Sequence, residues 1–357
     1  MPCSQVVTGA LALVLLALAL LAGAALASVV VEVPAPHLDA AEKTLVVDTD
    51  AGADDALAIL ELLLMEKINP KFKTVAITCV QGNTGVENVT KNVLATLKIV
   101  DRLDVPVYTG AAAPLLPPQP AVDPYFGSDG FGDFLAGATV VSVPDPLLYV
   151  PEEPAAVALV KLAKKNPGQL SLVCIGPLTN VALAARLDPS FLDNLRELFI
   201  LGGAARGNGN TAPGTEFNVH GDPGAFAAVL GSVKTPVYLM PWETVLGAEL
   251  PMMWRIKVLG KLQSLPVQFL NYAEAVSLPK MTGWTSGDGL MAAFVIDPTV
   301  AAVGRAVRVQ VLVGEGPGRG VTLVDHSNTT ALPGNAVLIE QADPAAFRRV
   351  LLTLLNS

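Results

Sequence analysis

Short apolar runs alternate with longer amphipathic stretches along most of the chain. The runs are rich in Val, Ile and Leu, as in strands buried on both faces, and the stretches carry apolar residues at helical spacing. The predicted strands cover residues 45–47, 74–80, 105–110, 170–175, 197–203 and 236–241. The predicted helices cover residues 54–68, 88–103 and 154–165, and two more begin at Thr179 and Pro223. This alternation predicts an α/β fold with a doubly wound, mostly parallel open sheet.

Two segments depart from the alternation. Residues 307–325 form two strand-like runs around a Gly-rich turn, which predicts an antiparallel edge near the C-terminus. Residues 111–133 form a Pro-rich loop that is too long for a simple connector, and long ordered loops are more often functional. No internal repeat or low-complexity linker divides the chain. Residues 44–357 are therefore expected to form one domain.

The N-terminal segment has the pattern of an export signal. An apolar stretch from about Ala10 to Ala27 ends in Ala-Leu-Ala, a small-x-small cleavage pattern. Residues 1–27 are interpreted as a secretory signal peptide, and residues 28–43 as a short exposed lead-in. Because no Lys or Arg precedes the apolar stretch, an uncleaved membrane anchor is the alternative. Either way, the rest of the chain is expected in the secretory lumen or outside the cell.

Composition and charge narrow the class of ligand. The chain of 357 residues is 52% hydrophobic and has a formal net charge of −9, with no run of Lys and Arg. These properties argue against a nucleic-acid surface and favour a small-molecule substrate. A membrane is expected as a partner only if the N-terminal segment stays uncleaved. The sequence is compatible with a homo-oligomer. Cys79 and Cys174 lie in apolar strand-like segments and are expected to be buried free thiols.

Four aspartates follow the first predicted strand within eight positions, at Asp48, Asp50, Asp54 and Asp55. Carboxylates this close repel one another, and keeping several of them ionised requires a cation or strong hydrogen bonds. A helix N-terminus would accommodate Asp54 and Asp55, because its dipole favours acids. That alternative leaves Asp48 and Asp50 unexplained, so the stretch favours a metal site.

Two enzyme families place such a D-x-D pattern after a strand. A haloacid-dehalogenase-like phosphatase also needs a downstream Lys at a strand end, whereas Lys164 and Lys165 lie in a predicted helix. Asp48–Asp55 matches every fixed position of D-x-D-x-G-x-D-D, the opening signature of the inosine-uridine preferring nucleoside hydrolase family. The chain resembles this family further along, with the elements in the family's order. The matching elements are Gln81-Gly82-Asn83, Ile175–Asn180, Gly207-Asn208, Glu216-Phe217-Asn218, Asp288 and Arg319–Asp325.

The resemblance implies calcium-dependent hydrolysis of the N-glycosidic bond of ribonucleosides on a Rossmann-like nucleoside hydrolase fold. By resemblance, Ca²⁺ would be held by Asp50, Asp55, Asp288 and the backbone carbonyl of Ile175, all oxygen ligands that suit a hard cation. Asp50 would also be the catalytic base. Asp48 would lie behind the metal ligands and orient them. The implied substrate-binding residues are Asp54, Asn83, Asn208, Glu216 and Asn218.

The sequence differs from the family on the side of the leaving base. Many members carry His directly before the last metal-binding Asp, where it protonates the departing base, and this chain has Gly287 there. Trp284 is a candidate to stack on the base, with simple packing as its alternative. His220 is a candidate to supply the proton. Because the calcium and ribose residues match, a secreted, non-catalytic module that binds calcium and a nucleoside is the competing function.

Overall fold

The computed structural model describes residues 43–117, 124–137 and 140–356. The predicted signal peptide over residues 1–27 and the lead-in up to Glu42 lie outside the described residues, so both stay predictions. Within the described residues, no helix is both long enough and apolar enough to cross a membrane. All the described residues belong to one compact unit, Val33–Ser357.

A twisted sheet forms the centre of this unit, as the sequence predicted. In the described part of the chain it has eight strands in the order β3-β2-β1-β4-β5-β6-β10-β7, and every neighbouring pair is parallel except β10 and β7. The strands are β1 (Lys43–Thr49), β2 (Phe72–Cys79), β3 (Val107–Thr109), β4 (Leu170–Cys174), β5 (Leu195–Leu201), β6 (Val237–Met240), β7 (Ala301–Val307) and β10 (Ala336–Ala342).

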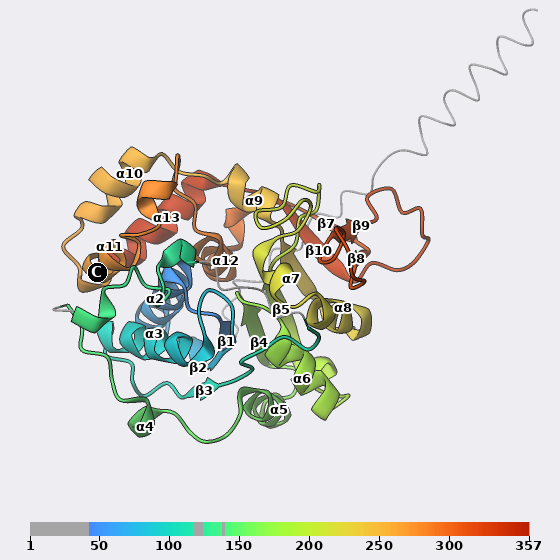
Figure 1. Cartoon of the computed structure of the whole chain (residues 1–357), viewed down its shortest axis with the longest axis horizontal. Helices are drawn as coiled ribbons and strands as arrows, with labels where there is room; N and C mark the ends of the chain where they lie inside the picture. The colour runs from blue at the N-terminus through green and yellow to red at the C-terminus, as the bar shows by residue number, and fades with distance from the viewer. Residues whose placement is uncertain (1–42, 118–123, 138–139, 357) are drawn as a thin grey trace, which may run out of the picture. The chain divides into compact units, whose positions relative to one another are not determined.

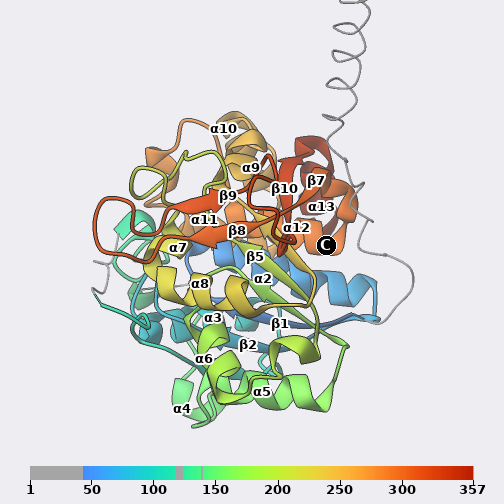
Figure 2. The ribbon, with the colours of Figure 1, turned by 90° about the vertical axis from the view of Figure 1, so that its right-hand side faces the viewer.

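Helices cover both faces of the sheet (Figure 1). Leu45 and Val47 of β1 pack into one apolar cluster, and Val46 between them packs into the other, because successive side chains of a strand point to opposite faces. One face carries α2 (Ala53–Ile68), α3 (Val86–Ile99), α11 (Leu265–Ala273), α12 (Gly287–Ile296) and α13 (Pro344–Leu355). The other carries α5 (Ala155–Lys165), α6 (Thr179–Leu187) and α8 (Pro223–Ser232), which lie in front of the strands in Figure 2. Burial on both faces explains why the middle of β1, Leu45–Val47, is a continuous apolar run.

The order of the strands creates a crevice between β1 and β4. The chain proceeds from β1 to β2 and β3 in one direction, then returns through α5 to β4 on the other side of β1. At such a reversal the connections leave toward opposite faces, and ligands bind outside the carboxyl ends of the two strands. The stretch Asp48–Asp55 follows β1, and the turn Ile175–Asn180 follows β4. The topology therefore brings two of the predicted site segments together.

The C-terminal edge differs in part from the prediction. Residues 307–325 do contain an antiparallel pair, β8 (Val309–Val311) with β9 (Thr322–Val324), as expected. This pair forms a separate small sheet that packs on α8, rather than extending the main sheet. The antiparallel edge of the main sheet is β7, which pairs with β10. The sequence of β7, AAVGRAV, is too short of large apolar residues to stand out as a strand.

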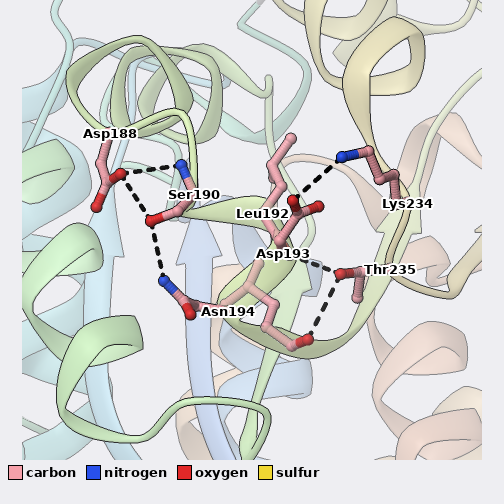
Figure 3. Close-up of polar contacts among 8 residues, drawn as sticks. Asp188, Ser190, Leu192, Asp193, Asn194, Lys234 and Thr235 are labelled. Atoms are coloured by element: carbon pink, nitrogen blue, oxygen red, sulfur yellow. Dashed lines mark hydrogen bonds and ion pairs between the residues drawn. The ribbon is translucent and has the colours of Figure 1, made fainter.

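Polar groups at the surface pair with one another near the amino-terminal end of β5, opposite the strand ends that carry the predicted site. Asp188 accepts hydrogen bonds from the backbone N and Oγ of Ser190, and Lys234 pairs with Asp193 at 3.3 Å (Figure 3). A hollow of about 320 Å³ lies beside them between α6 and α8. Its wall is mostly Ala, Pro and Leu, and its paired charges face solvent. These features distinguish this hollow from the carboxyl ends of the strands, where the aspartates of Asp48–Asp55 lie.

Four short helices complete the described fold around the main elements, and they are α4 (Pro146–Tyr149), α7 (Phe217–Gly221), α9 (Trp242–Gly247) and α10 (Met252–Lys257). Cys79 and Cys174 end β2 and β4, and both are buried and free, as predicted.

A buried carboxyl group without a hydrogen-bond partner among the described residues lies between α2 and α12. Glu61 of α2 is fully buried, and neither of its carboxyl oxygens has a hydrogen-bond partner among the described residues. A Cβ added to Gly289 of α12 would lie 3.1 Å from Glu61 Oε1, so the carboxyl packs against that helix. Burial raises the pKa of Glu61 well above its ordinary value, because the interior disfavours the charged form.

We expect Glu61→Met to stabilise the protein, because Met fills similar space without an unsatisfied carboxyl. The expected gain is about 1–3 kcal/mol near neutral pH. A raised pKa in the folded state gives stability that is full below the unfolded value and is lost as pH rises through the folded value. The advantage of the Met variant in urea unfolding should therefore grow between about pH 5 and about pH 8. A Met variant that is less stable at both pH values would contradict an unpaired Glu61.

Candidate functional site

A cavity of about 330 Å³ opens at the carboxyl ends of the parallel strands. Its wall combines residues from the loops after β1, β2, β4, β5 and β6, from the start of α12 and from the loop near residue 125. The polar and charged side chains of the wall are Asp50, Asp54, Asn83, Tyr125, Asn210, Thr211, Glu216, Asn218, Trp242, Glu249, Lys280, Thr282, Thr285 and Asp288. This cavity holds most of the residues that the sequence singled out.

Three carboxylates meet where α2 and α12 begin. Asp54 and Asp55 lie in the first turn of α2, Asp288 lies in the first turn of α12, and oxygens of all three lie within 4.8 Å of one another. The two helices pack side by side, so their N-termini arrive together at the cavity. Each helix dipole favours an acid at this end, but three adjacent negative charges still repel. The cluster needs protons or a cation to be stable.

Asp50 is held beside this cluster by two close backbones. A Cβ added to Gly82 would lie 1.9 Å from Asp50 Oδ2, and one added to Gly176 would lie 3.0 Å from Oδ1, so glycine is required for Asp50 to fit. The backbone N of Asn83 donates to Oδ2 at 2.8 Å. Oδ1 is buried and has no hydrogen-bond partner in the described structure. A buried oxygen without a donor is suited to bind a cation.

The electrostatics of these acids fit a cation as well. Burial, followed by the charge of Asp55, raises the pKa of Asp50 well above its ordinary value and that of Asp54 to about 7. Burial and the other three aspartates likewise raise the pKa of Asp288. The carbonyl of Ile175 lines the same cavity and would add a neutral oxygen. The residues present therefore form an oxygen-rich site that suits a hard divalent cation.

Asp48 lies behind the cluster, in the place expected for an orienting residue. It is fully buried, and its Oδ1 accepts hydrogen bonds from Thr78 Oγ1 at 2.5 Å and from Asn180 Nδ2 at 2.8 Å. Asn180 also donates to the carbonyl of Cys79 and accepts from the backbone N of Ala111. Burial raises the pKa of Asp48 to about 7. Asn180 thus ties the ends of β1, β2 and β3 together beneath the cavity.

Asn83 and Asn218 line the cavity on either side of the acids. Asn83 Nδ2 donates to Asp55 Oδ2 at 3.3 Å. Asn218 Nδ2 donates to the carbonyls of Ile175 and Leu201 at 3.1 and 3.2 Å, which leaves Oδ1 as its remaining polar atom. Both amides are therefore anchored to the groups that would hold a cation. They are placed to orient a bound molecule rather than to react with it.

Glu216 is anchored in a different way, by backbone N–H groups. Its carboxyl accepts from the backbone N of Gly203, Asn218 and Val219 at 2.9–3.1 Å, and burial raises its pKa to about 7. Asn208, in contrast, is exposed and is not part of the cavity wall. Asn210 lies in the wall instead, where its Oδ1 accepts from the backbone N of Phe217. The resemblance had pointed to Asn208, and it gave Asn210 no role.

Neither Trp284 nor His220, the two residues considered for contact with the leaving base, lies in the cavity wall. Trp284 is 1% exposed, stacks on Phe347 and donates its ring N–H to Glu274 at 3.2 Å. Stacking on a base is therefore wrong for Trp284, because its ring is enclosed in the core. His220 is half-buried behind the wall, where burial and then the charge of Arg319 lower its pKa and favour the neutral ring. His220 is therefore not placed as the proton donor that the sequence considered.

Other residues that the sequence did not single out form this part of the wall. Trp242 follows β6 directly, so the rule about strand ends was a signal that pointed to it. Lys280 donates to the carbonyls of Pro124 and Tyr125, which fixes this part of the long loop beside the cavity. No pattern in the sequence indicated Lys280 or Glu249.

Comparisons with known proteins agree with this arrangement. The family described as inosine-uridine preferring nucleoside hydrolase matches the chain over residues 45–349. A protein named probable uridine nucleosidase 1, from Oryza sativa subsp. japonica, is 38% identical over 53% of this chain and 55% of its own length. A protein named non-specific ribonucleoside hydrolase RihC, from Salmonella enteritidis, is 38% identical over 53% of this chain and 57% of its own length. The chain thus spans about half the length of these relatives.

Solved structures extend the likeness to most of the fold. A protein titled Inosine-Guanosine Nucleoside Hydrolase superposes with a TM-score of 0.80 and 28% identity, over 88% of this chain and 98% of its own. A purine-preferring ribonucleoside hydrolase from Gardnerella vaginalis superposes with a TM-score of 0.74 and 27% identity, over 88% and 98%.

A divalent cation such as Ca²⁺ should stabilise the protein more at high pH than at low pH. Without a cation, the raised pKa values make stability full at low pH and cause its loss as pH rises through about 7, the pKa of Asp54. At a cation concentration about 100 times Kd, we expect about 2.7 kcal/mol, or roughly 5 °C in Tm, near pH 8 and much less near pH 5. Thermal unfolding after chelation measures this. An equal shift at both pH values, or a full shift in Asp288→Asn, would contradict the site.

Proposed function

The chain belongs to the inosine-uridine preferring nucleoside hydrolase family, and we propose that it hydrolyses the N-glycosidic bond of ribonucleosides in a calcium-dependent reaction. The products would be ribose and a free base. The observation that carries the proposal is one cavity in which Asp50, Asp54 and Asp288 lie beside Asn83 and Asn218. The names of the relatives, which refer to uridine, purine and unspecified ribonucleosides, support the same class of substrate.

Asp50, Asp55, Asp288 and the carbonyl of Ile175 would hold the calcium ion, with Asp54 within 4.8 Å of the other two clustered acids. When bound, calcium supplies a fixed positive charge that makes a nearby water more acidic and orients the hydroxyls of the ribose. The described residues of the cavity wall include no His or Cys, which favours an oxygen-preferring cation over zinc.

Asp50 is the proposed general base. Its Oδ2 accepts from the backbone N of Asn83 and its Oδ1 has no donor, so the carboxyl could hold the cation through one oxygen and take a proton from the attacking water through the other. Because Gly82 and Gly176 confine the side chain, Oδ1 has little freedom to turn away. A fixed base in a buried site needs little reorganisation during the reaction.

The other polar groups would hold the sugar and favour its transition state. Asp54 of the acidic cluster, together with Asn83 and Asn218, would bind the ribose hydroxyls, and Glu216 lines the same wall. As the glycosidic bond breaks, the ribose ring gains positive charge. Carboxylates fixed around that charge stabilise it more than they stabilise the neutral substrate, which lowers the barrier.

A non-catalytic nucleoside-binding protein is the second candidate, and Gly287 is the observation that favours it. Gly287 lies in the cavity wall directly before Asp288, and it has no side chain with which to protonate a departing base. Loss of a general acid costs about 10²–10⁴-fold in rate where nothing replaces it. Binding and hydrolysis therefore have to be measured separately.

The purified protein should release ribose from purine and pyrimidine ribonucleosides when calcium is present. Asp50→Asn should lower kcat by about 10²-fold or more, because the amide cannot accept the proton. Asp193→Asn, at the opposite edge of the sheet, is the matched control and should leave the rate unchanged. A reducing-sugar assay measures the release. Saturable nucleoside binding without ribose release would favour the non-catalytic candidate instead.

A histidine at position 287 should accelerate hydrolysis if the missing acid limits the rate. A Cβ at this position would lie 3.0 Å from Leu201 Cδ2, so Leu201 has to shift slightly, and Gly287→Ala is the control for that crowding. Relative to the Ala variant, we expect Gly287→His to raise kcat for inosine by about 10-fold or more. The gain should fade above about pH 6.5, where the imidazole loses its proton. Equal rates in the two variants would show that leaving-group protonation is not limiting.

A further inference from the structure

The wall of the cavity carries one charged side chain whose charge is not used within the described structure. Asp50, Asp54 and Asp288 belong to the acidic cluster, Glu216 binds backbone N–H groups, and Lys280 binds loop carbonyls. Glu249 lines the same wall and is exposed, and its carboxyl makes no hydrogen bond or ion pair with the described residues. A carboxylate aimed into a ligand cavity without a partner is available to bind the ligand.

The backbone around Glu249 is built so that its carboxyl can lie against the wall. Leu250 and Trp284 exchange two backbone hydrogen bonds of 2.8 and 2.9 Å, which fixes the segment containing Glu249 beside Gly283. A Cβ added to Gly283 would lie 2.1 Å from the carboxyl carbon of Glu249. The carboxyl therefore rests on the glycine, in space that any other residue would fill.

The location of Glu249 relates it to the base rather than to the sugar. The wall continues from Gly283, where Glu249 rests, through Thr285 and Gly287 to Asp288 in the acidic cluster. The cluster would hold the ribose, so Glu249 lies one short segment away from the sugar. Trp242 and Tyr125 also line the cavity and offer flat apolar surfaces to a planar ring.

We propose that Glu249 is a specificity-determining residue that binds the edge of the base and selects guanosine. This inference rests on the proposed function, because it takes the acidic cluster as the ribose site. The two oxygens of a carboxylate accept hydrogen bonds and donate none. Guanine presents two adjacent donors on its Watson–Crick edge, N1–H and the N2 amino group, and so matches both oxygens at once.

The other common bases match a carboxylate less well. Hypoxanthine lacks the amino group and offers N1–H alone, and uracil offers one N–H between two carbonyls. Adenine pairs one donor with one acceptor on this edge, so its ring nitrogen would face a carboxylate oxygen without a proton between them. An amide side chain has the opposite fit, since it bonds to adenine through one donor and one acceptor. The identity of the terminal group at position 249 should therefore set the order of preference.

Glu249→Gln tests the proposal by changing that group with little change in size. We expect the ratio of kcat/KM for guanosine to that for adenosine to fall by at least about 10-fold, as for the loss of one bidentate pair. Hydrolysis of nitrophenyl riboside should stay within about 2-fold, because this substrate has the sugar but no base edge. Glu152→Gln, an exposed carboxylate outside the cavity, is the matched control and should change neither value.

Gly283→Ala offers an independent variant that keeps the charge. Its Cβ would displace the Glu249 carboxyl, so guanosine should lose its advantage over inosine while nitrophenyl riboside is still cleaved. An unchanged guanosine-to-adenosine ratio in Glu249→Gln would overturn the proposal. So would an equal loss on every substrate including nitrophenyl riboside, because that pattern indicates a structural role.

Failure of the proposed function gives a different result. A wild-type protein that cleaves neither nucleosides nor nitrophenyl riboside would overturn hydrolysis. The ratio of Kd values for guanosine and adenosine, measured by calorimetry in the wild type and in Glu249→Gln, then tests Glu249 without turnover. A fall of at least about 10-fold in the preference for guanosine would support its role. An unchanged ratio, or no binding of either nucleoside, would overturn it.

Discussion

The repulsion among buried carboxylates is the constraint on which the rest of this structure depends. Asp54, Asp55 and Asp288 have oxygens within 4.8 Å of one another, and Asp50 lies beside them with one oxygen unpartnered. Few arrangements keep such a group folded, because each buried acid needs a fixed orientation and a compensating positive field. The N-termini of α2 and α12 supply part of that field, and a bound cation would supply the remainder.

The neighbouring residues make sense as supports for this cluster. Asn180 joins three strand ends beneath it, and Thr49 and the backbone of Gly52 donate to Asp55. Gly82 and Gly176 allow Asp50 to approach two backbones. These contacts orient the acids even before a ligand binds, which is what a site needs if it is to act on a transition state rather than adapt to it.

The fold and the ribose side of the site could be predicted because both follow from the parallel sheet. Asp50 and Asn83 closely follow β1 and β2, so the parallel sheet alone placed them at the same ends of the strands. Asn218 lies in α7, far beyond the end of β5, and was added by the resemblance to the family. The burial of individual side chains near the site could not be predicted in the same way. Trp284 lies close to Asp288 in sequence, yet its ring points into the core against Phe347. The edge strand β7 was missed because its small residues carry little strand preference.

The base side escapes prediction for a further reason, which also bears on the chemistry. It is built from α9 and the segment before α12, whose side-chain directions depend on local contacts such as that between Glu249 and Gly283. A departing base takes the electrons of the glycosidic bond and becomes an anion unless it gains a proton. A nearby carboxylate raises the energy of that anion. Under the proposed function, the carboxylate of Glu249 and the lack of an acid at Gly287 therefore have the same effect on the reaction. Both favour hydrolysis of nucleosides whose base is already protonated when the glycosidic bond breaks.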